Sequence, residues 1–299
     1  MNTDKFFDWN RQVILDRARD GCQFKLWKDN FNSFPFAVHK DGFLVFTSPH
    51  QLDTCDEYIN GDPFGMEDNL ESEFQKGRVK TTIRLISEFI SDSSKQYRVL
   101  DVGCGQGHIT AKILTTFPNM EVTGMDVSIS AIKTAHKSYK GVDFIVGDAY
   151  QPPFAENYFD IIVCNNMWEH ITDPVRMLEQ TGRILKMDGV FIMSTPSRFR
   201  IMNLIKVIMG KKVLINDNHI TEYTVGQVFE QFGHAGFSIS KARGLHVKGQ
   251  GGRFVTRFFI HIIIKPVLTW LITLIGSHHI FESTAFYVGR KQTNRNKPS

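Results

Sequence analysis

Short apolar runs alternate with helical segments between residues 97 and 196, and this alternation limits the fold more than any other feature of the chain. The apolar runs are YRVLDV, EVTGMD, VDFIVGD, FDIIVCNN and GVFIMST. Strands that are apolar along their length are buried on both faces, and intervening helices connect parallel strands. We therefore predict an α/β fold, a doubly wound and mostly parallel seven-stranded sheet with helices on both faces. The last two strands are predicted at FSISKA and STAFYVGRK.

The chain divides into two predicted parts. Residues 1–70 are rich in Phe and turn residues and have no sustained helical or strand period, so they form an N-terminal extension of unassigned fold. Residues 71–299 form the main domain, which begins with an amphipathic helix that ends near SDSSK. Two apolar-basic insertions, at about 198–215 and 250–280, interrupt this domain, and the second precedes the last strand.

Composition excludes several classes of protein. The 299 residues allow a sizeable core, and a net charge of +4, from 35 Lys and Arg against 31 Asp and Glu, does not favour nucleic acid as a partner. The first twelve residues lack the apolar stretch of a signal peptide. Four scattered cysteines without a CxxC pair predict reduced thiols in a cytoplasmic protein: Cys22, Cys55, Cys104 and Cys164.

A glycine-rich run, VLDVGCGQG at residues 99–107, ends the first strand and begins a helix. Gly103, Gly105 and Gly107 allow a tight turn and the close approach of a ligand. Their GxGxG spacing differs from the GxGxxG of dinucleotide sites, where a helix end binds a pyrophosphate. Asp101, two residues before the first glycine, favours a cationic ligand. S-adenosylmethionine (SAM) has no phosphate and carries an ammonium and a sulfonium, so it fits; a glycine turn without a ligand is the alternative.

Two more acidic residues end the next two predicted strands. Asp126 closes EVTGMD, where a carboxylate can accept hydrogen bonds from both ribose hydroxyls, although a helix N-cap is the alternative role. Asp148, in VGDA, could receive the amino group of adenine. Three acids at the ends of three successive strands, with a glycine loop after the first, predict a nucleoside site.

These segments together resemble the class I SAM-dependent methyltransferases, in particular the type 11/12 methyltransferases. The resemblance covers about residues 71–299 and rests on VLDVGCGQG, the strand-end Asp126, GDA, FDIIVCNNMWEHITDP and RILKMDGV. It implies a Rossmann-like fold, SAM as the cofactor, and a methionyl pocket, a ribose site and an adenine site. The implied cofactor-binding residues are Asp101, Gly103, Cys104, Gly105, Gly107, Asp126, Val127, Asp148, Ala149 and Asn165.

The segment after the fourth strand, NMWEHITDP, resembles the E-x-x-E-H stretch of ubiquinone-type O-methyltransferases, which can hold a divalent metal. Glu169 and His170 match, but Asn166 replaces the first acid, and an amide oxygen is a poorer ligand than a carboxylate. We therefore expect no metal. His170 is a candidate general base, with a hydrogen bond to backbone as the alternative role. Asp173 and Pro174 fit a helix N-cap and the first helical residue.

A second candidate segment is HITEYT, just before a helix predicted at 225–234. Related enzymes place a similar His-x-x-x-Tyr segment near the acceptor pocket, which makes His219 and Tyr223 candidate catalytic residues by resemblance. A capped turn ahead of a helix explains the same residues equally well.

The two apolar-basic insertions have the composition of membrane-surface segments. Within residues 254–275, Arg257, His261 and Lys265 recur every four residues against a broad apolar surface, as in an interfacial helix. These cations and Pro266 argue against a transmembrane helix. Residues 198–215 mix apolar and basic residues in the same way. We predict peripheral contact with the inner face of a membrane, while a lid or dimer face is the alternative.

The sequence therefore predicts a SAM-dependent methyltransferase that acts on an oxygen of a small lipophilic or lipid-linked acceptor, with carbon and nitrogen acceptors left open. An NAD-dependent reductase is disfavoured by the GxGxG spacing and by the lack of a Tyr-x-x-x-Lys pair. A catalytically silent SAM-binding or membrane-scaffold module remains an alternative. The acceptor and the oligomeric state do not follow from the sequence.

Overall fold

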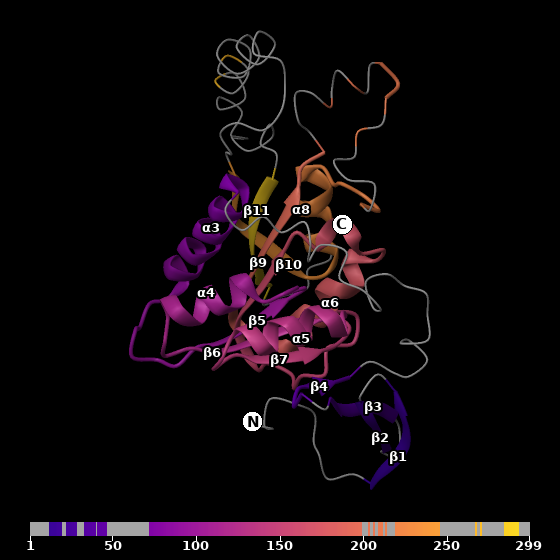
Figure 1. Cartoon of the computed structure of the whole chain (residues 1–299). Coiled ribbons are helices and arrows are strands. Elements are labelled where there is room, and N and C mark those ends of the chain that lie inside the picture. The colour runs from indigo at the N-terminus through magenta and orange to yellow at the C-terminus, as the bar shows by residue number, and fades with distance from the viewer. Residues whose placement is uncertain are drawn as a thin grey trace.

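The computed structural model describes residues 41–46, 72–198, 219–245 and 284–292, the backbone of 12–19, 22–28 and 33–39, and a few single positions elsewhere. These residues form an eleven-stranded sheet in the order β1-β2-β3-β4-β7-β6-β5-β8-β9-β11-β10. Figure 1 shows this sheet running through the molecule with helices packed against it.

Seven of these strands are the predicted ones. Five are parallel neighbours, and β11 pairs antiparallel with both β9 and β10. The predicted Rossmann-like and mostly parallel arrangement is confirmed for these seven strands, with an antiparallel hairpin at one edge, but the sheet that contains them has eleven strands rather than seven. The strands are β5 (Arg98–Val102), β6 (Glu121–Asp126), β7 (Asp143–Val146), β8 (Phe159–Asn165), β9 (Leu185–Pro196), β10 (Phe237–Leu245) and β11 (Thr284–Lys291).

Four further strands extend the sheet at its other edge, where the sequence assigned no fold. They are β1 (Gln12–Arg19), β2 (Cys22–Lys28), β3 (Ser33–His39) and β4 (Leu44–Val45). Consecutive strands of this set pair antiparallel, and β4 pairs parallel with β7. Phe43 and Val45 are fully buried in a cluster with Phe144. The pairing partner of β4 lies about a hundred residues away, so no local period in the sequence could reveal this junction.

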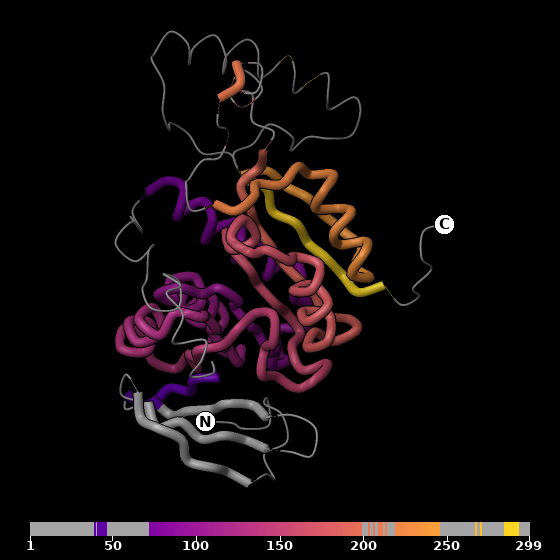
Figure 2. The backbone as a smooth tube through the Cα atoms, turned by 90° about the vertical axis from the view of Figure 1, so that its right-hand side faces the viewer, coloured from indigo at the N-terminus to yellow at the C-terminus, as the bar shows by residue number. Residues whose placement is uncertain are grey.

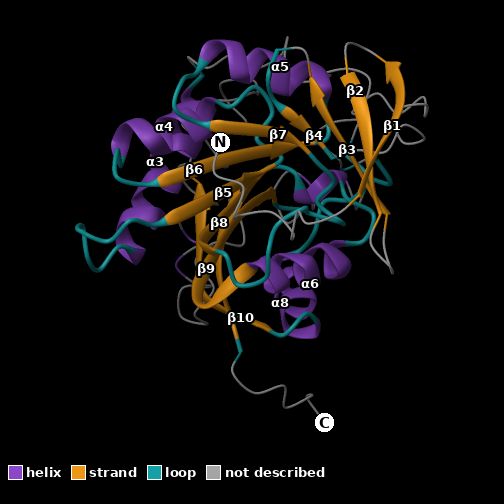
Figure 3. Ribbon diagram, turned by 90° about the horizontal axis from the view of Figure 1, so that it is seen from below, coloured by secondary structure: helices purple, strands orange, loops and turns teal. Residues whose placement is uncertain are grey.

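The helices cover both faces of the sheet, as Figure 3 shows. One face carries α3 (Glu73–Phe89), α4 (His108–Thr116) and α5 (Ile129–Ser138). The other carries α6 (Pro174–Ile184) and α8 (Val225–His234), and a single 3-10 turn, η1 (Trp168–His170), follows β8. In Figure 2 the yellow strand β11 runs beside the orange helix α8.

Side-chain caps fix where several of these helices begin. Ser72, Ser128, Asp173 and Thr224 each accept a hydrogen bond from the backbone N–H three residues further on. Such caps stabilise a helix by about 1 kcal/mol each. The predicted N-cap role of Asp173 is confirmed.

A buried aromatic cluster packs under α6 and α8 and supports the turn after β8. Trp168 is fully buried against Phe191 and Phe232, and its indole N–H donates a hydrogen bond to Gln231 at 2.9 Å. Because η1 is anchored through this tryptophan, the two residues after it, Glu169 and His170, have a fixed position at the end of the sheet.

The apolar-basic insertions lie almost wholly outside the described residues. The described members include Met209, Val267 and Trp270, whose side chains are 58%, 54% and 63% exposed. Within the described part of the chain, no helix has both the length and the apolar character needed to cross a bilayer.

Candidate functional site

The predicted cofactor residues lie at the carboxyl ends of four neighbouring parallel strands. In the order β7-β6-β5-β8, these strands end beside Asp148, Asp126, the glycine loop and Asn165. Ligands of open α/β sheets bind in the crevice outside the carboxyl ends of the strands. Val127 and Ala149 follow the same strand ends.

 Ala149 packs partly buried against the main hydrophobic cluster, and the side chain of Asp148 accepts a hydrogen bond from the backbone N–H of Tyr150 at 2.8 Å.

The three loop glycines all have positive φ angles, of 70° at Gly103, 52° at Gly105 and 82° at Gly107. A Cβ atom at Gly103 would lie 2.5 Å from the sulfur of Met167, and one at Gly107 would lie 2.6 Å from the Phe144 ring. No atom of the described residues lies within 4 Å of the corresponding position at Gly105. Packing therefore requires glycine at the two outer positions, while Gly105 presents open space where a ligand can lie against the backbone.

Asp126 connects the glycine loop to the start of α5. Its Oδ2 accepts a hydrogen bond from the Gly105 N–H at 2.8 Å, and its Oδ1 accepts one from the Ser128 N–H at 2.9 Å. An ionised carboxylate has about four acceptor positions. Asp126 is half-buried, so it can hold the loop and still accept hydrogen bonds from a ribose diol.

Asp101 lies beneath the loop with only 2% of its surface exposed, and it accepts a hydrogen bond from the Thr110 hydroxyl at 2.7 Å. Burial raises the pKa of Asp101 to about 7, and the charge of Asp126 acts in the same direction, while Thr110 and the Arg78 guanidinium oppose the shift. A carboxylate held in this way gains from a nearby cation, such as the ammonium of SAM.

The affinity for SAM should therefore depend on pH through Asp101. If the bound ammonium favours the ionised carboxyl group, binding releases a proton below pH 7, and we expect affinity to fall by up to about tenfold per pH unit below that value. Titration calorimetry between pH 5.5 and 7.5, in buffers of different ionisation enthalpy, measures both effects. Asp101→Asn should remove the dependence, and equal proton release in this variant would contradict the assignment.

Cys104 contributes its backbone to the loop rather than its thiol. The Cys104 N–H donates to the carbonyl of Met125, and the side chain packs partly buried beneath the loop in the cluster that contains Phe144. Burial raises the pKa of the Cys104 thiol well above its usual value, so the thiol stays protonated and is unsuited to act as a nucleophile.

Asn165 ends β8 as a buried amide with 7% of its surface exposed. Its side-chain oxygen accepts hydrogen bonds from Thr82 of α3 at 3.3 Å and from Ser194 of β9 at 2.9 Å. Its Nδ2 has no hydrogen-bond partner among the described residues. A buried donor without a partner is costly, so this amide suits a ligand acceptor such as the carboxylate of the methionyl group.

Sequence reasoning missed the contribution of α3 to this site. Arg78 lies near enough to Asp101 and Glu169 for its charge to oppose the rise in the pKa of both carboxyl groups. Thr82, one turn further along, contacts Asn165. In the sequence, these two polar residues are four positions apart, next to the apolar positions of an amphipathic helix. Such a pair does not indicate which strand of the sheet it will contact.

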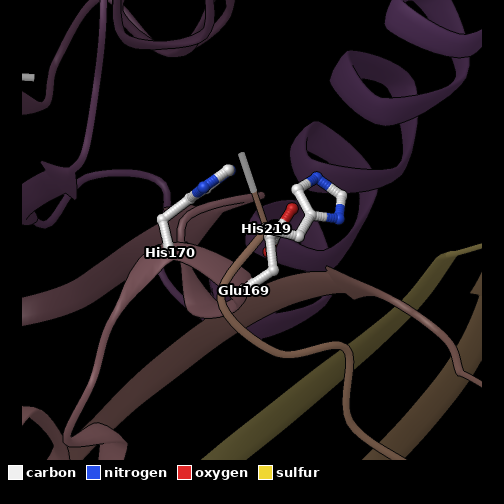
Figure 4. A group of neighbouring side chains, drawn as sticks. All are labelled: Glu169, His170 and His219. Carbon is white, nitrogen blue, oxygen red and sulfur yellow. The ribbon is translucent and has the colours of Figure 1, made fainter. Parts of the chain in front are cut away.

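A second group of polar side chains lies beyond the end of β8. Glu169 and His170 belong to η1, and His219 belongs to the segment before α8. Each residue nevertheless offers one potential metal-ligating atom, and these three atoms lie within 4.8 Å of one another. Figure 4 shows the three side chains. The His170 and His219 rings pack edge to face, with 5.0 Å between the ring centroids. The structure therefore brings together two candidate bases that are 49 positions apart in the sequence.

Glu169 is almost completely buried. Its two oxygens accept hydrogen bonds from Thr195 at 3.0 Å and from the Asn166 amide at 3.4 Å. Burial raises the pKa of Glu169 to about 7, against the opposing effects of a backbone hydrogen bond, His219, Thr195 and Arg78. Asn166 itself adopts the left-handed conformation with a φ of 53°, which turns the chain from β8 into η1.

Tyr223 follows His219 by four positions in the chain. It packs against the hydrophobic cluster beneath α8, and its backbone carbonyl accepts a hydrogen bond from Arg198. Burial raises the pKa of the Tyr223 hydroxyl, which a hydrogen bond to Gln231 partly offsets. A tyrosine in this state can donate a hydrogen bond but is a poor base, so its predicted catalytic role stays a proposal.

Glu169, His170 and His219 could hold a divalent cation, whereas the sequence favoured no metal. Both oxygens of Glu169 already accept hydrogen bonds, and burial favours its protonated form. We therefore expect dialysis against EDTA to leave methyl transfer unchanged. Metal analysis of the purified protein provides the control, and one tightly bound metal ion per chain, with activity lost on its removal, would contradict this expectation.

Comparison with known families places this domain among methyltransferases. The family model described as a methyltransferase domain matches residues 93–233. The malonyl-acyl-carrier protein O-methyltransferase 1 of Ilyobacter polytropus is 34% identical over 112 residues, which are 36% of this chain and 41% of that protein. The demethylmenaquinone methyltransferase of Thermotoga maritima is 35% identical over 92 residues, or 31% of this chain and 40% of that protein. The chain thus spans about two fifths of the length of these curated relatives.

Solved structures share the fold at low sequence identity. A chain in the complex of the Haloferax volcanii Trm112 methyltransferase activator with a methyltransferase has a TM-score of 0.56 and 17% identity, covering 80% of this chain and 99% of that one. The [4+2]-cyclase SpnF has a TM-score of 0.52 and 20% identity, covering 76% and 86%. Together with the glycine loop and the strand-end acids, these matches show that the domain at residues 93–233 belongs to the class I SAM-dependent methyltransferase family, whose cofactor is S-adenosylmethionine.

Proposed function

We propose that this protein transfers the methyl group of SAM to an oxygen of a small lipophilic or lipid-linked acceptor. The observation that carries the proposal is the set of residues at the strand ends. No side chain fills the space at Gly105, the Asp126 carboxylate holds the Gly105 N–H, and Nδ2 of Asn165 has no hydrogen-bond partner among the described residues. The Asp126 carboxylate can accept hydrogen bonds from the ribose diol of SAM, and Nδ2 of Asn165 can donate one to its carboxylate.

The chain's own residues would bind and orient the cofactor. When bound, SAM supplies a methyl group that the sulfonium has already activated, so catalysis depends mainly on position and exclusion of water. Asp126 and Asp148 would hold the nucleoside, while Asp101 and Asn165 would hold the methionyl group. We propose that the acceptor approaches from the side of His170 and His219, beyond the end of β8.

The lipophilic nature of the acceptor is supported by two observations. The described positions within the apolar-basic insertions include the exposed side chains of Val267 and Trp270. One of the two curated relatives is named for a malonyl group on acyl-carrier protein, and the other is named for demethylmenaquinone, a lipophilic quinone. We propose a peripheral position on the inner face of a membrane, which flotation with anionic liposomes tests.

Calorimetric titration with SAM and S-adenosylhomocysteine tests the cofactor, and transfer of radiolabelled methyl to a lipid extract tests the activity. We expect binding of both ligands and label in the organic phase. SpnF shares this fold and is named as a cyclase, so binding without methyl transfer to any acceptor would favour a silent or differently acting SAM-binding protein. A failure of both ligands to bind would overturn the proposed function.

A further inference from the structure

Tyr150 connects the loop after β7 to the turn after η1. It lies two residues after Asp148, and its hydroxyl oxygen accepts hydrogen bonds from the backbone N–H groups of Thr172 and Asp173, both at 2.9 Å. The turn at residues 171–173 leads from η1 into α6. One side chain thus joins the loop proposed to bind adenine to the beginning of a helix.

The hydroxyl of Tyr150 uses all of its hydrogen-bonding positions. Its two lone pairs accept the two backbone N–H groups, so its own proton is directed to the Thr172 hydroxyl, which lies 3.1 Å away. The Arg176 guanidinium of α6 lies over the Tyr150 ring, 5.5 Å from the ring centroid, where a cation is attracted to an aromatic face. The ring also packs partly buried against the main hydrophobic cluster. These contacts hold the side chain in one orientation.

The backbone of Tyr150 holds the Asp148 carboxylate. The Tyr150 N–H donates a hydrogen bond to Oδ1 of Asp148 at 2.8 Å, and the Gln151 N–H donates one to the Asp148 carbonyl at 3.0 Å, which closes a turn. An ionised carboxylate has about four acceptor positions, so Asp148 can still accept a hydrogen bond from a ligand. The direction in which these positions face depends on how the turn is held.

The turn at residues 171–173 is a fixed support for this contact. Trp168 anchors η1 in the core, Ile171 is only 6% exposed, and Asp173 caps α6 through a hydrogen bond from the Arg176 N–H at 3.0 Å. The described loop between β7 and β8, in contrast, contains no helix. The Tyr150 side chain therefore attaches a loop without regular structure to a well-anchored turn.

We infer that Tyr150 is a positioning residue for the cofactor. Its hydroxyl keeps the Asp148 carboxylate where it accepts a hydrogen bond from the adenine amino group, and in this way it sets the preference for adenine. This inference rests on the proposed function, in which Asp148 holds the nucleoside. A site built to bind an N–H group rejects a ligand that lacks the group, because the acceptor in the site is then left unpaired. This discrimination requires that the acceptor is held in place, so a loosened turn should discriminate less.

Tyr150→Phe removes the hydroxyl and keeps the ring, and Tyr158→Phe is its matched control. Tyr158 also has an arginine over its ring, Arg98 at 4.3 Å from the centroid. Its hydroxyl donates a hydrogen bond to Glu121 at 3.1 Å, at the amino ends of β6 and β8. The probes are S-adenosylhomocysteine and its 6-deamino analogue, in which hydrogen replaces the adenine amino group. Titration calorimetry measures the affinity of each protein for both probes.

We expect the wild type and Tyr158→Phe to bind S-adenosylhomocysteine at least about tenfold more tightly than the analogue, as for the loss of a hydrogen bond to a charged group. In Tyr150→Phe this preference should fall to about threefold or less. A merely structural role would weaken the binding of both probes equally, so an unchanged preference in Tyr150→Phe would overturn the positioning role.

The behaviour of the wild type separates this inference from the proposed function. If the wild type bound both probes equally well, the assignment of Asp148 to adenine would be wrong, and the role of Tyr150 with it. If the wild type bound neither probe, the proposed function itself would fail.

Hydrogen exchange in the wild type tests the same contact even if Tyr150→Phe fails to fold. The N–H groups of Thr172 and Asp173 both donate to the Tyr150 hydroxyl. We therefore expect S-adenosylhomocysteine to slow exchange at these two amides several-fold, and the 6-deamino analogue to slow it less, as followed by NMR. Exchange rates at Thr172 and Asp173 that stay the same when S-adenosylhomocysteine binds would contradict the inference.

Discussion

Replacing Asp126 by Ala should weaken SAM binding by about 10- to 150-fold, which corresponds to about 1.5–3 kcal/mol for the loss of hydrogen bonds to a charged group. Asp126 would lose its contacts with the ribose and also its hydrogen bond to the Gly105 N–H, so the loop and the ligand are affected together. Titration calorimetry of the wild type and of Asp126→Ala measures the difference directly.

Asp188→Ala is the matched control for this experiment. Asp188 is exposed near the amino end of β9, whereas the glycine loop follows the carboxyl end of β5. We expect this variant to bind SAM as the wild type does. If Asp126→Ala bound SAM with unchanged affinity, Asp126 would have to be reassigned to a purely structural role at the start of α5.

Two alanine substitutions in the glycine loop should separate binding from stability. At Gly107 a Cβ would lie 2.6 Å from the Phe144 ring and 3.0 Å from Ala135, and the φ of 82° adds strain. Overpacking costs about 1–3 kcal/mol and the left-handed conformation about 1–2 kcal/mol. We therefore expect Gly107→Ala to lower the free energy of unfolding by about 2–5 kcal/mol, as measured by urea denaturation.

Gly105→Ala should affect SAM affinity more than it affects the free energy of unfolding. Its added methyl group meets no atom of the described residues, so only the strain of a positive φ, about 1–2 kcal/mol, should appear in the free energy of unfolding. The same methyl group would enter the space that the ligand needs, and SAM affinity should fall by at least about tenfold, or about 1.4 kcal/mol. Unchanged SAM affinity in Gly105→Ala would show that the cofactor does not lie over this residue.

Much of the fold was predictable because its signals are local. The helix at Val225–His234 was predicted with the same bounds, and the helix from Pro174 ends one residue before the predicted end. Continuous apolar strands, helical periods and capping residues act over a few positions, and each leaves a pattern in the sequence. The four strands of the N-terminal extension left no such pattern, because β4 joins the sheet through β7, far away in the chain.

The cofactor edge could be predicted for a related reason. Each of its acidic residues ends a recognisable strand, and parallel strands place their carboxyl ends at the same edge of a sheet. The order of strands in space was not needed to expect that Asp101, Asp126 and Asp148 would lie near one another.

By itself, the sequence determined seven strands of the sheet, the glycine loop and the strand-end acids, since strand periodicity and glycine spacing act within single segments. Only the tertiary structure decided which polar groups from distant segments meet. The Glu169 carbonyl binds the segment that carries His219, and α3 brings Arg78 and Thr82 to the strand ends. Such contacts depend on how helices and loops pack over the finished sheet, and no local pattern of residues encodes that packing.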